Sequence, residues 1–305
     1  AMAKKKVSGV IVDLRGNGGG LLEHARAITG MFVATGPVVQ TRYPNEETQV
    51  LADEDPSIDF SGEVVVLVDR FSASASEIVA GALQDYGRAL IAGTGPTHGK
   101  GTVQMLVDLD RLRGAPGKPL GVLKLTIQQF FRINGDSTQW RGVVPDITLP
   151  NPVAHIEAGE RFLDNAIPWT EVQALKFNKW TASKWNLTEL KSRSTTRQGK
   201  SAVFAKIRER SNFLESRRKE TIVSLARSKW LAKRKKDRDA LESADPKLDE
   251  GTARFTVRPI DYAKSSSKAG AKAEAERIAN WKKALSRDPW VDEARHILGD
   301  MMSGR

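Results

Sequence analysis

Apolar and polar positions follow different patterns on the two sides of Pro150. Before it, short β-branched runs alternate with stretches in which apolar residues recur at helical spacing. This alternation predicts strands separated by helices, which is typical of an α/β layer architecture. The predicted strands are 7–13, 38–43, 64–68, 90–92, 102–109 and 121–132, and the predicted helices are 21–34 and 75–86. We therefore expect an α/β domain over residues 1–150.

After Pro150, glycine becomes scarce and long stretches have the apolar spacing of amphipathic helices. The predicted helices are 157–166, 170–178, 186–193, 198–241, 269–287 and 290–302. Six tryptophans fall in this half, and we expect them in a helical core: Trp169, Trp180, Trp185, Trp230, Trp281 and Trp290. The pattern predicts a second, mostly α-helical domain over residues 151–305.

The two halves also differ in charge. Residues 1–150 carry 15 lysines and arginines against 16 aspartates and glutamates, whereas residues 151–305 carry 33 against 21. A basic helical domain suits nucleic acid, an anionic surface or an acidic protein partner, and it is also what a solvated lysine-rich exterior looks like. Nucleic acid is the least favoured partner, because the aromatic side chains that would stack on bases are expected in the core.

Composition excludes several classes of protein. The chain has no cysteine, which rules out disulfides, thiol catalysis and cysteine-bound metals. No run approaches the roughly 18 apolar residues of a membrane-spanning helix. The four histidines form no metal-binding pattern, so we predict neither a metal nor another cofactor.

Three glycine- or serine-rich turns follow predicted strands: 13–20 (DLRGNGGG), 69–77 (DRFSASASE) and 93–102 (GTGPTHGKGT). The first can gather backbone N–H groups around an oxyanion, or it is only a tight turn. The serines of the second can attack a substrate or simply cap the following helix. The third differs from a phosphate-binding loop at Thr94 and Gly101, and a strand follows it, so nucleotide binding is not predicted.

A reactive serine needs a base, and two residues of the third turn are candidates. His98 is the one histidine in a loop expected near the serines, so a histidine-based triad rests on it alone. Lys100 lies between glycines with an apolar strand on either side. Burial there would lower its pKa toward neutrality, as a lysine base requires.

Taken together, these turns resemble the carboxy-terminal-processing proteases of peptidase family S41. DLRGNGGG, VDRFSASASEI, QDYGRALIAGTGPTHGKGTVQ and RGVVPDI occur in the order of that family. The segment GERFLDNAIPW and the basic helical extension are similar to the C-terminal domain of its tail-specific branch. The resemblance implies a mixed-sheet α/β core of the S41/crotonase-like type, a mostly α-helical C-terminal domain and no cofactor.

The resemblance also implies roles for single residues. The middle serine of SASASE, Ser74, matches the nucleophile, and Lys100 matches the base. Gln104 matches a residue that positions this lysine, and Asp85 belongs to the same network in the tail-specific branch. The loop that carries Lys100 is one residue longer than the usual form.

An oxyanion hole is implied at the start of the second predicted helix. The amide of Ala75 would provide one hydrogen bond, and an amide of the glycine turn would provide the other. Among the turn's glycines we favour Gly19 over Gly18.

The implied activity is that of a serine endopeptidase that cleaves proteins near or from their C-terminus through an acyl-enzyme. Its substrates would be unfolded or C-terminally recognised proteins in the bacterial periplasm, with an adaptor protein of the cell envelope as a further partner. Members of the family carry a signal peptide, an N-terminal helical region and a PDZ domain before the first motif. These are absent here, so we expect a fragment. The alternative is a catalytically silent fragment that binds a partner or an anionic envelope component.

Overall fold

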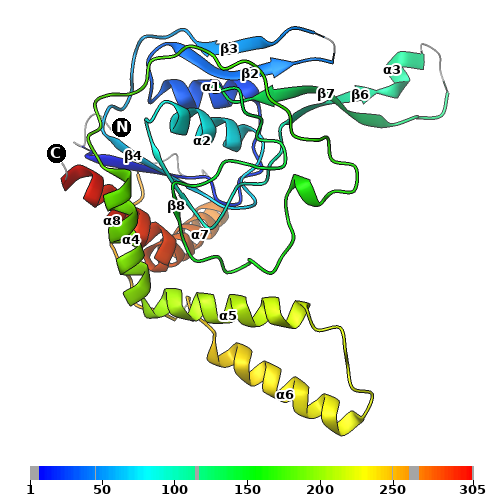
Figure 1. The fold of residues 1–305 in the computed structure, drawn as a ribbon, viewed down its shortest axis with the longest axis vertical. Helices are drawn as coiled ribbons and strands as arrows, with labels where there is room; N and C mark the ends of the chain where they lie inside the picture. The colour runs from blue at the N-terminus through cyan, green and yellow to red at the C-terminus, as the bar shows by residue number, and fades with distance from the viewer. Residues whose placement is uncertain (1–6, 45, 114–116, 249, 261–267, 304–305) are drawn as a thin grey trace. The chain divides into compact units, whose positions relative to one another are not determined.

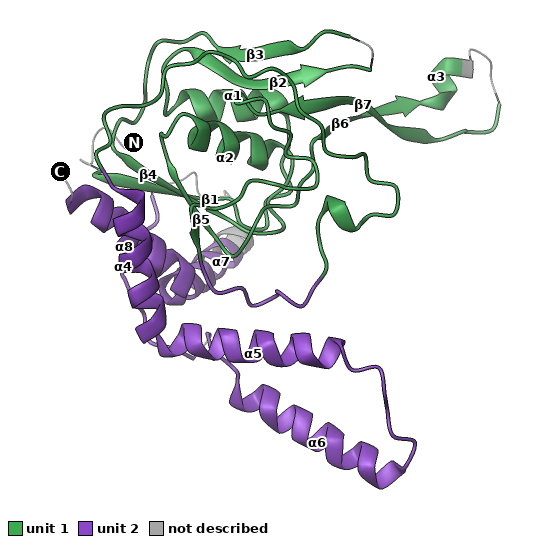
Figure 2. Ribbon diagram, in the orientation of Figure 1, with its two compact units in different colours: residues 1–148, 157–184 green, residues 149–156, 185–305 purple. Residues whose placement is uncertain are grey.

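The computed structural model describes residues 7–44, 46–113, 117–248, 250–260 and 268–303. The chain forms two compact units (Figure 2). Unit 1 is Ala1–Thr148 with Glu157–Lys184, and unit 2 is Leu149–Ile156 with Trp185–Arg305. The sequence predicted domains over residues 1–150 and 151–305. In the structure, residues 149–156 belong to unit 2, and residues 157–184 belong to unit 1.

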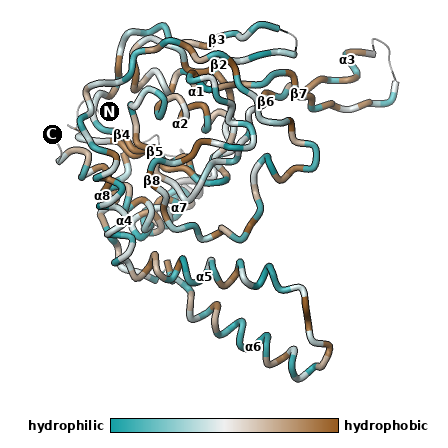
Figure 3. Tube along the Cα trace, viewed as in Figure 1, coloured by the Kyte–Doolittle hydropathy of each residue, from teal (hydrophilic) through white to brown (hydrophobic). Residues whose placement is uncertain are grey.

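The first sheet of unit 1 is parallel, with strand order β1-β4-β5-β8. Its strands are β1 (Gly9–Asp13), β4 (Glu63–Val68), β5 (Leu90–Gly93) and β8 (Ile147–Thr148). Every residue of β4 is buried, and its apolar run is brown in Figure 3. The unbroken apolar sequence of residues 64–68 is typical of a strand that is covered on both faces, as β4 is.

The second sheet is antiparallel, with strand order β3-β2-β7-β6. Its strands are β2 (Gly36–Arg42), β3 (Gln49–Asp53), β6 (Thr102–Asp108) and β7 (Val122–Phe131). The sequence pattern did not predict β3, a short strand with acidic residues on both sides. Two of its five residues are exposed, two are half-buried and only Asp53 is buried. β6 and β7 form a hairpin in which Thr102 pairs with Gln129 and Asp108 pairs with Val122.

Two helices, α1 (Leu22–Gly30) and α2 (Ala75–Asp85), lie between the sheets (Figure 1). One hydrophobic cluster joins β2, β4, β7 and α2. Nine of the eleven residues of α2 are buried, from Ala75 to Leu83. A helix buried on all sides holds its first turn rigidly, and this turn carries the serine motif. The expected α/β core is confirmed.

Unit 2 is mostly helical, as predicted. Its helices are α4 (Leu187–Lys200), α5 (Ala202–Arg218), α6 (Arg227–Ser243), α7 (Lys268–Arg287) and α8 (Pro289–Ser303). Arg197 of α4 forms ion pairs with Glu293 at 2.8 Å and Asp300 at 2.6 Å, both on α8. Within the described residues, no helix is long and apolar enough to cross a membrane.

The helices predicted over 157–166 and 170–178 are wrong. The first segment holds only the 3₁₀ turn Glu160–Phe162, and the second holds no helix. The amide of Val172 instead donates to Gly135 O at 2.9 Å, and that of Leu175 donates to Ile133 O at 2.9 Å. These hydrogen bonds to a distant part of unit 1 outweigh the local helical propensity.

The single helix predicted over 198–241 is also wrong in its continuity. Ser201 separates α4 from α5, and its hydroxyl accepts a hydrogen bond from the amide of Phe204 at 3.3 Å as a helix N-cap. Residues 219–226, which include a β-branched run, then separate α5 from α6. Apolar periodicity continued through both breaks and concealed them.

The prediction of a tryptophan-rich helical core holds only for Trp290. Its side chain is buried, meets the ring of Phe204 edge-on at 6.4 Å, and donates to Pro150 O at 2.9 Å. Trp230 and Trp281 are 38% and 49% exposed. The other three, Trp169, Trp180 and Trp185, lie outside the helices.

Candidate active site

Ser74 lies between β4 and α2 in a backbone conformation that serine rarely adopts. Its φ is 57° and its ψ is −118°. A residue that only caps a helix has an extended backbone, whereas a positive φ in a non-glycine residue costs about 1–3 kcal/mol and persists where the surroundings impose it. This strain separates Ser74 from Ser72, whose hydroxyl has a structural role and donates to Leu14 O at 2.8 Å.

The buried carboxylate of Glu77 holds the backbone of both proposed catalytic residues. Its Oε2 accepts hydrogen bonds from the amides of Ser74 at 2.7 Å and Lys100 at 3.0 Å. Its Oε1 accepts from the Thr97 hydroxyl at 2.5 Å and the Gly99 amide at 2.7 Å. The Glu77 side chain is fully buried. One carboxylate therefore joins the start of α2 to the loop that precedes β6.

Burial raises the pKa of Glu77 to about 7, although its four hydrogen bonds act in the opposite direction. A carboxyl group whose pKa is raised on folding binds more protons in the folded state than in the unfolded state. Its contribution to stability therefore decreases as the pH rises from its ordinary value of 4.5 to about 7.

Glu77→Gln is expected to destabilise the protein by about 2–4 kcal/mol, because the amide NH₂ replaces an acceptor and faces buried donors. The variant should also lose most of its serine reactivity, since Ser74 and Lys100 lose their common partner. A thermal melt and serine-probe labelling measure the two effects. The control is Glu23→Gln on α1, whose side chain is 63% exposed and which should change the free energy of unfolding by less than about 0.5 kcal/mol. Equal melting temperatures for both variants would contradict this role of Glu77.

Lys100 lies in a loop that is tied to the serine turn. The amide of His98 donates to Ser72 O at 2.9 Å. The Lys100 side chain is half-buried, and this burial, followed by the nearby charge of Lys124, lowers its pKa. A lysine that acts as a base needs a shift in this direction.

The glycine turn lies directly against the nucleophile. Gly19 has a φ of 93°, and a Cβ there would come within 2.5 Å of Ala73 O and 2.7 Å of the Ala75 amide nitrogen, so no side chain fits. The Gly19 amide donates to Asn17 Oδ1 at 2.9 Å in this structure. Ala75 is the first residue of α2, and its amide has no partner within the helix. Gly19 therefore lies directly against the Ala75 amide.

Asp69 connects the glycine turn to the serine turn. Its Oδ1 accepts hydrogen bonds from the amides of Gly16 and Ser72, both at 3.0 Å. The sequence analysis assigned no role to Asp69 or Glu77. The spacing of Ser74 and Glu77 matches a capping box, S-x-x-E, and this signal would have identified the glutamate. No comparable signal marks the contact of Asp69 with Gly16, which lies 53 residues earlier in the sequence.

A cavity of about 180 Å³ lies beside Gly19 and Ala75. Its walls are mostly apolar side chains of α1 and α2 together with backbone of the glycine turn. The lining residues are Leu14, Asn17, Gly19, Gly20, Leu21, His24, Ala25, Ile28, Ala75, Ser76 and Val79. The cavity can hold one small apolar side chain next to the proposed oxyanion hole.

Asp85 lies apart from Ser74, at the opposite end of α2. Asp85 is the last residue of α2, about 15 Å along the helix from Ala75. It forms an ion pair with Arg132 at 2.5 Å, and burial raises its pKa. Gln104 is exposed on β6, opposite Thr126. The roles expected for both residues remain predictions.

In the part of the chain that the structure describes, no group of three or more histidine, aspartate or glutamate side chains could hold a metal ion. The chemistry that the described residues provide is that of a serine, a partly buried lysine and backbone amides.

Comparison with known proteins gives two adjacent family matches. Residues 1–149 match peptidase family S41, and residues 153–303 match the C-terminal domain of tail specific protease. The chain is 44% identical over 176 residues to a tail-specific protease of Haemophilus influenzae, a match that covers 58% of this chain and 25% of that protein. It is 39% identical over 150 residues to a carboxy-terminal-processing protease of Bartonella bacilliformis, covering 48% and 32%.

Among solved structures, the photosystem II D1 C-terminal processing protease is similar, with 35% identity and a TM-score of 0.42 over 48% of this chain and 36% of that one. The chain spans about a quarter to a third of the length of the two curated relatives. The family matches account for nearly every residue between 1 and 303. Residues 1–149 therefore belong to peptidase family S41, and residues 153–303 to the family of tail-specific protease C-terminal domains.

Proposed function

We propose that unit 1 is the catalytic domain of a serine peptidase with Ser74 as the nucleophile and Lys100 as the base. The observation that carries this proposal is the buried Glu77 carboxylate, which binds the backbone amides of both residues. The strained backbone of Ser74 and the lowered pKa of Lys100 support the same assignment.

The reaction would proceed through an acyl-enzyme. Ser74 Oγ attacks the carbonyl carbon of the scissile bond while Lys100 Nζ takes its proton, and the Ala75 amide binds the oxyanion. When the C–N bond breaks, Lys100 returns the proton to the leaving amine. Water then attacks the ester carbonyl and gives a proton to Lys100, which passes it to Ser74 Oγ as the bond between the acyl carbon and Oγ breaks and the acid product leaves. For Gly19 to contribute to the oxyanion hole, its amide must give up its hydrogen bond to Asn17 Oδ1 and donate to the oxyanion instead.

Asp85 and Gln104 are proposed as positioning residues. Asp85 acts through its ion pair with Arg132, which connects the C-terminal end of α2 to the residue that follows β7. Gln104 lies four residues beyond Lys100 on β6, from where it can restrict the lysine side chain when substrate is present.

The whole protein is proposed to be a C-terminal-processing endopeptidase of the bacterial periplasm, acting on unfolded or C-terminally recognised proteins with an adaptor of the cell envelope. The names of the similar proteins support the processing activity. Labelling of this chain with a fluorophosphonate, and cleavage of an unfolded reporter protein, test the proposal. A folded chain that neither labels nor cleaves would favour the alternative, a catalytically silent binding module.

The cavity beside Gly19 and Ala75 is proposed to receive the side chain on the acyl side of the scissile bond. Its volume of about 180 Å³ suits a small apolar residue. Ile28 lines the cavity and is 38% exposed, so it can be shortened without a large loss of stability. Ile28→Ala should raise the ratio of kcat/KM for leucine over alanine at this position by roughly 10-fold, the effect expected for one or two methylene groups.

Met31→Ala is the matched control, because Met31 follows the same helix, is 42% exposed and does not line the cavity. Its leucine-to-alanine ratio should equal that of the wild type. Competing peptide substrates that differ in this one residue give the ratio directly. An unchanged ratio for Ile28→Ala would place the substrate side chain elsewhere.

A further inference from the structure

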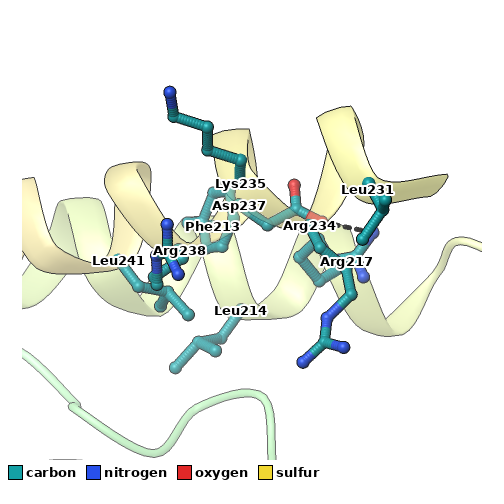
Figure 4. Close-up of a pocket in the computed structure, with 9 residues that line it drawn as sticks. All are labelled: Phe213, Leu214, Arg217, Leu231, Arg234, Lys235, Asp237, Arg238 and Leu241. Carbon is teal, nitrogen blue, oxygen red and sulfur yellow. Dashed lines mark ion pairs between the residues drawn. The ribbon is translucent and has the colours of Figure 1, made fainter. Parts of the chain in front are cut away.

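A second cavity, of about 690 Å³, lies far from the serine motif in sequence, between α5 and α6 of unit 2. Figure 4 shows the side chains that line it, with apolar groups and cations intermixed along the two helices. The lining residues are Phe213, Leu214, Arg217, Leu231, Arg234, Lys235, Asp237, Arg238 and Leu241. We call this cavity the α5–α6 groove.

The apolar side chains that line the groove, which we call its floor, are Phe213, Leu214, Leu231 and Leu241. On the α6 side they are only partly buried. All 17 residues of α6 are described, and none of them is buried. Leu231, one of the floor residues, is 48% exposed. A helix of this length in a folded protein normally buries an apolar stripe against a neighbour. Among the described residues, the apolar side chains with which α6 lines the groove are therefore left without a full covering.

The charge of the groove indicates what kind of partner fits. Residues 202–243 carry 13 lysines and arginines against six aspartates and glutamates. Four cations line the groove, and its one acid, Asp237, forms an ion pair with Arg217 at 3.1 Å. The groove therefore favours an anionic partner that also has apolar side chains.

We propose that the α5–α6 groove binds an acidic amphipathic helix of a partner protein. The lining residues of α6 run from Leu231 to Leu241, about 15 Å or nearly three helical turns. This length accommodates the anchors at i, i+3 or i+4, and i+7 by which helices bind hydrophobic grooves. Glutamates beside the anchors would meet Arg234, Lys235 and Arg238.

Two other anionic partners fit less well. A nucleic-acid backbone offers phosphates to the cations but nothing apolar to Phe213 or Leu231. A lipid bilayer offers both, but its surface cannot enter a groove between two helices as deeply as one helix can. The proposal does not depend on the protease chemistry, because no lining residue belongs to unit 1.

The test uses a fluorescein-labelled peptide of about 18 residues, with leucines at i, i+3, i+4 and i+7 and glutamates between them, so that it forms a helix with one apolar face. Binding to the whole chain is measured by fluorescence anisotropy at about 0.15 M salt. A peptide of the same composition in scrambled order is the first control. We expect binding of the patterned peptide at least tenfold tighter than that of the scrambled one.

Charge reversal distinguishes the groove from general attraction to a basic protein. Arg234→Glu, Lys235→Glu and Arg238→Glu together should weaken binding at least tenfold. The matched control reverses three cations of the same helix that do not line the groove, Arg227, Lys229 and Lys236, and should weaken it less than threefold. Leu231→Ser tests the apolar floor and should weaken binding at least fivefold. Circular dichroism verifies that each variant keeps its helix content.

Three results would overturn the proposal. Equal losses in the two charge-reversed variants would show attraction without a site. Equal binding of the scrambled peptide would show that no helix is recognised. Tighter binding of duplex DNA, or of phosphatidylglycerol vesicles, than of the patterned peptide would assign the groove to a different partner. Ser74→Ala should bind the peptide as the wild type does, so a failure here is distinguishable from a failure of the proposed catalysis.

Discussion

Ser74→Ala is expected to abolish fluorophosphonate labelling and to reduce peptide cleavage by on the order of 10⁴-fold or more, the usual effect of removing a catalytic serine. The variant should remain folded, because Ser74 is held by the hydrogen bond from its backbone amide to the Glu77 carboxylate, and alanine retains this amide. Alanine tolerates the positive φ no better than serine does, so the backbone strain is unchanged and stability should change little. Intact-mass measurement of the labelled protein reports the modified serine directly.

The neighbouring serines provide the controls. Ser76→Ala should keep most of the labelling rate, because Ser76 lies inside α2. Ser72→Ala should lower the melting temperature, because its hydroxyl donates to Leu14 O and accepts from the Asp69 amide, while the serine that reacts remains in place. If all three variants lose activity equally, the motif has a folding role and Ser74 is not the nucleophile.

Lys100→Arg is expected to be nearly inactive although it keeps the positive charge, because guanidinium does not release its proton at usable pH. In the wild type, Lys100 must be neutral to accept the serine proton. Burial and the charge of Lys124 lower its pKa from the ordinary 10.5. Activity should therefore rise with pH through this lowered pKa and level off above it. The pH profile of kcat/KM, or of the labelling rate, shows the rise.

His98→Ala separates lysine from histidine as the base. The His98 side chain lies near Glu160, with 3.6 Å between Nε2 and Oε2. The hydrogen bond from the His98 backbone amide to Ser72 O does not need this side chain. The variant should keep most of its activity and the same pH profile. An active Lys100→Arg combined with an inactive His98→Ala would assign the base to histidine and refute the dyad.

The local sequence predicted β4 and α2, the two elements on either side of Ser74, better than the rest of unit 1. The apolar run of 64–68 and the helical spacing of 75–86 are strong local signals, and both elements form as expected. The positions of Ser74 and Lys100 came from motif resemblance. What brings their backbones together is Glu77, whose partners are up to 23 residues away, and burial of a charged side chain at such a contact is not visible in periodicity.

Segments whose structure depends on distant contacts were predicted poorly. Residues 170–178 have helical periodicity, yet their backbone bonds to Ile133 and Gly135, more than 30 residues earlier. The break between α5 and α6 has a local cause, the run Thr221-Ile222-Val223, but apolar spacing on both sides concealed it. Asp85 forms its ion pair with Arg132, which lies outside the motif that contains Asp85, so the motif alone did not predict this contact.

The Gly99 and Lys100 amides share one acceptor, the Glu77 carboxylate, so we expect the loop before β6 to release both amides together. Withdrawal of this loop would remove the Gly99 and Lys100 amides together with the Thr97 hydroxyl, three of the four hydrogen bonds to the carboxylate. A buried carboxylate left with one partner costs several kcal/mol unless it takes up a proton. Loss of these bonds is therefore expected to be easier when Glu77 is protonated, and its pKa of about 7 places that change near neutral pH. In hydrogen exchange, the amides of Gly99 and Lys100 should lose protection together, and more readily at pH 6 than at pH 8. Independent exchange of these two amides would show that the loop opens gradually.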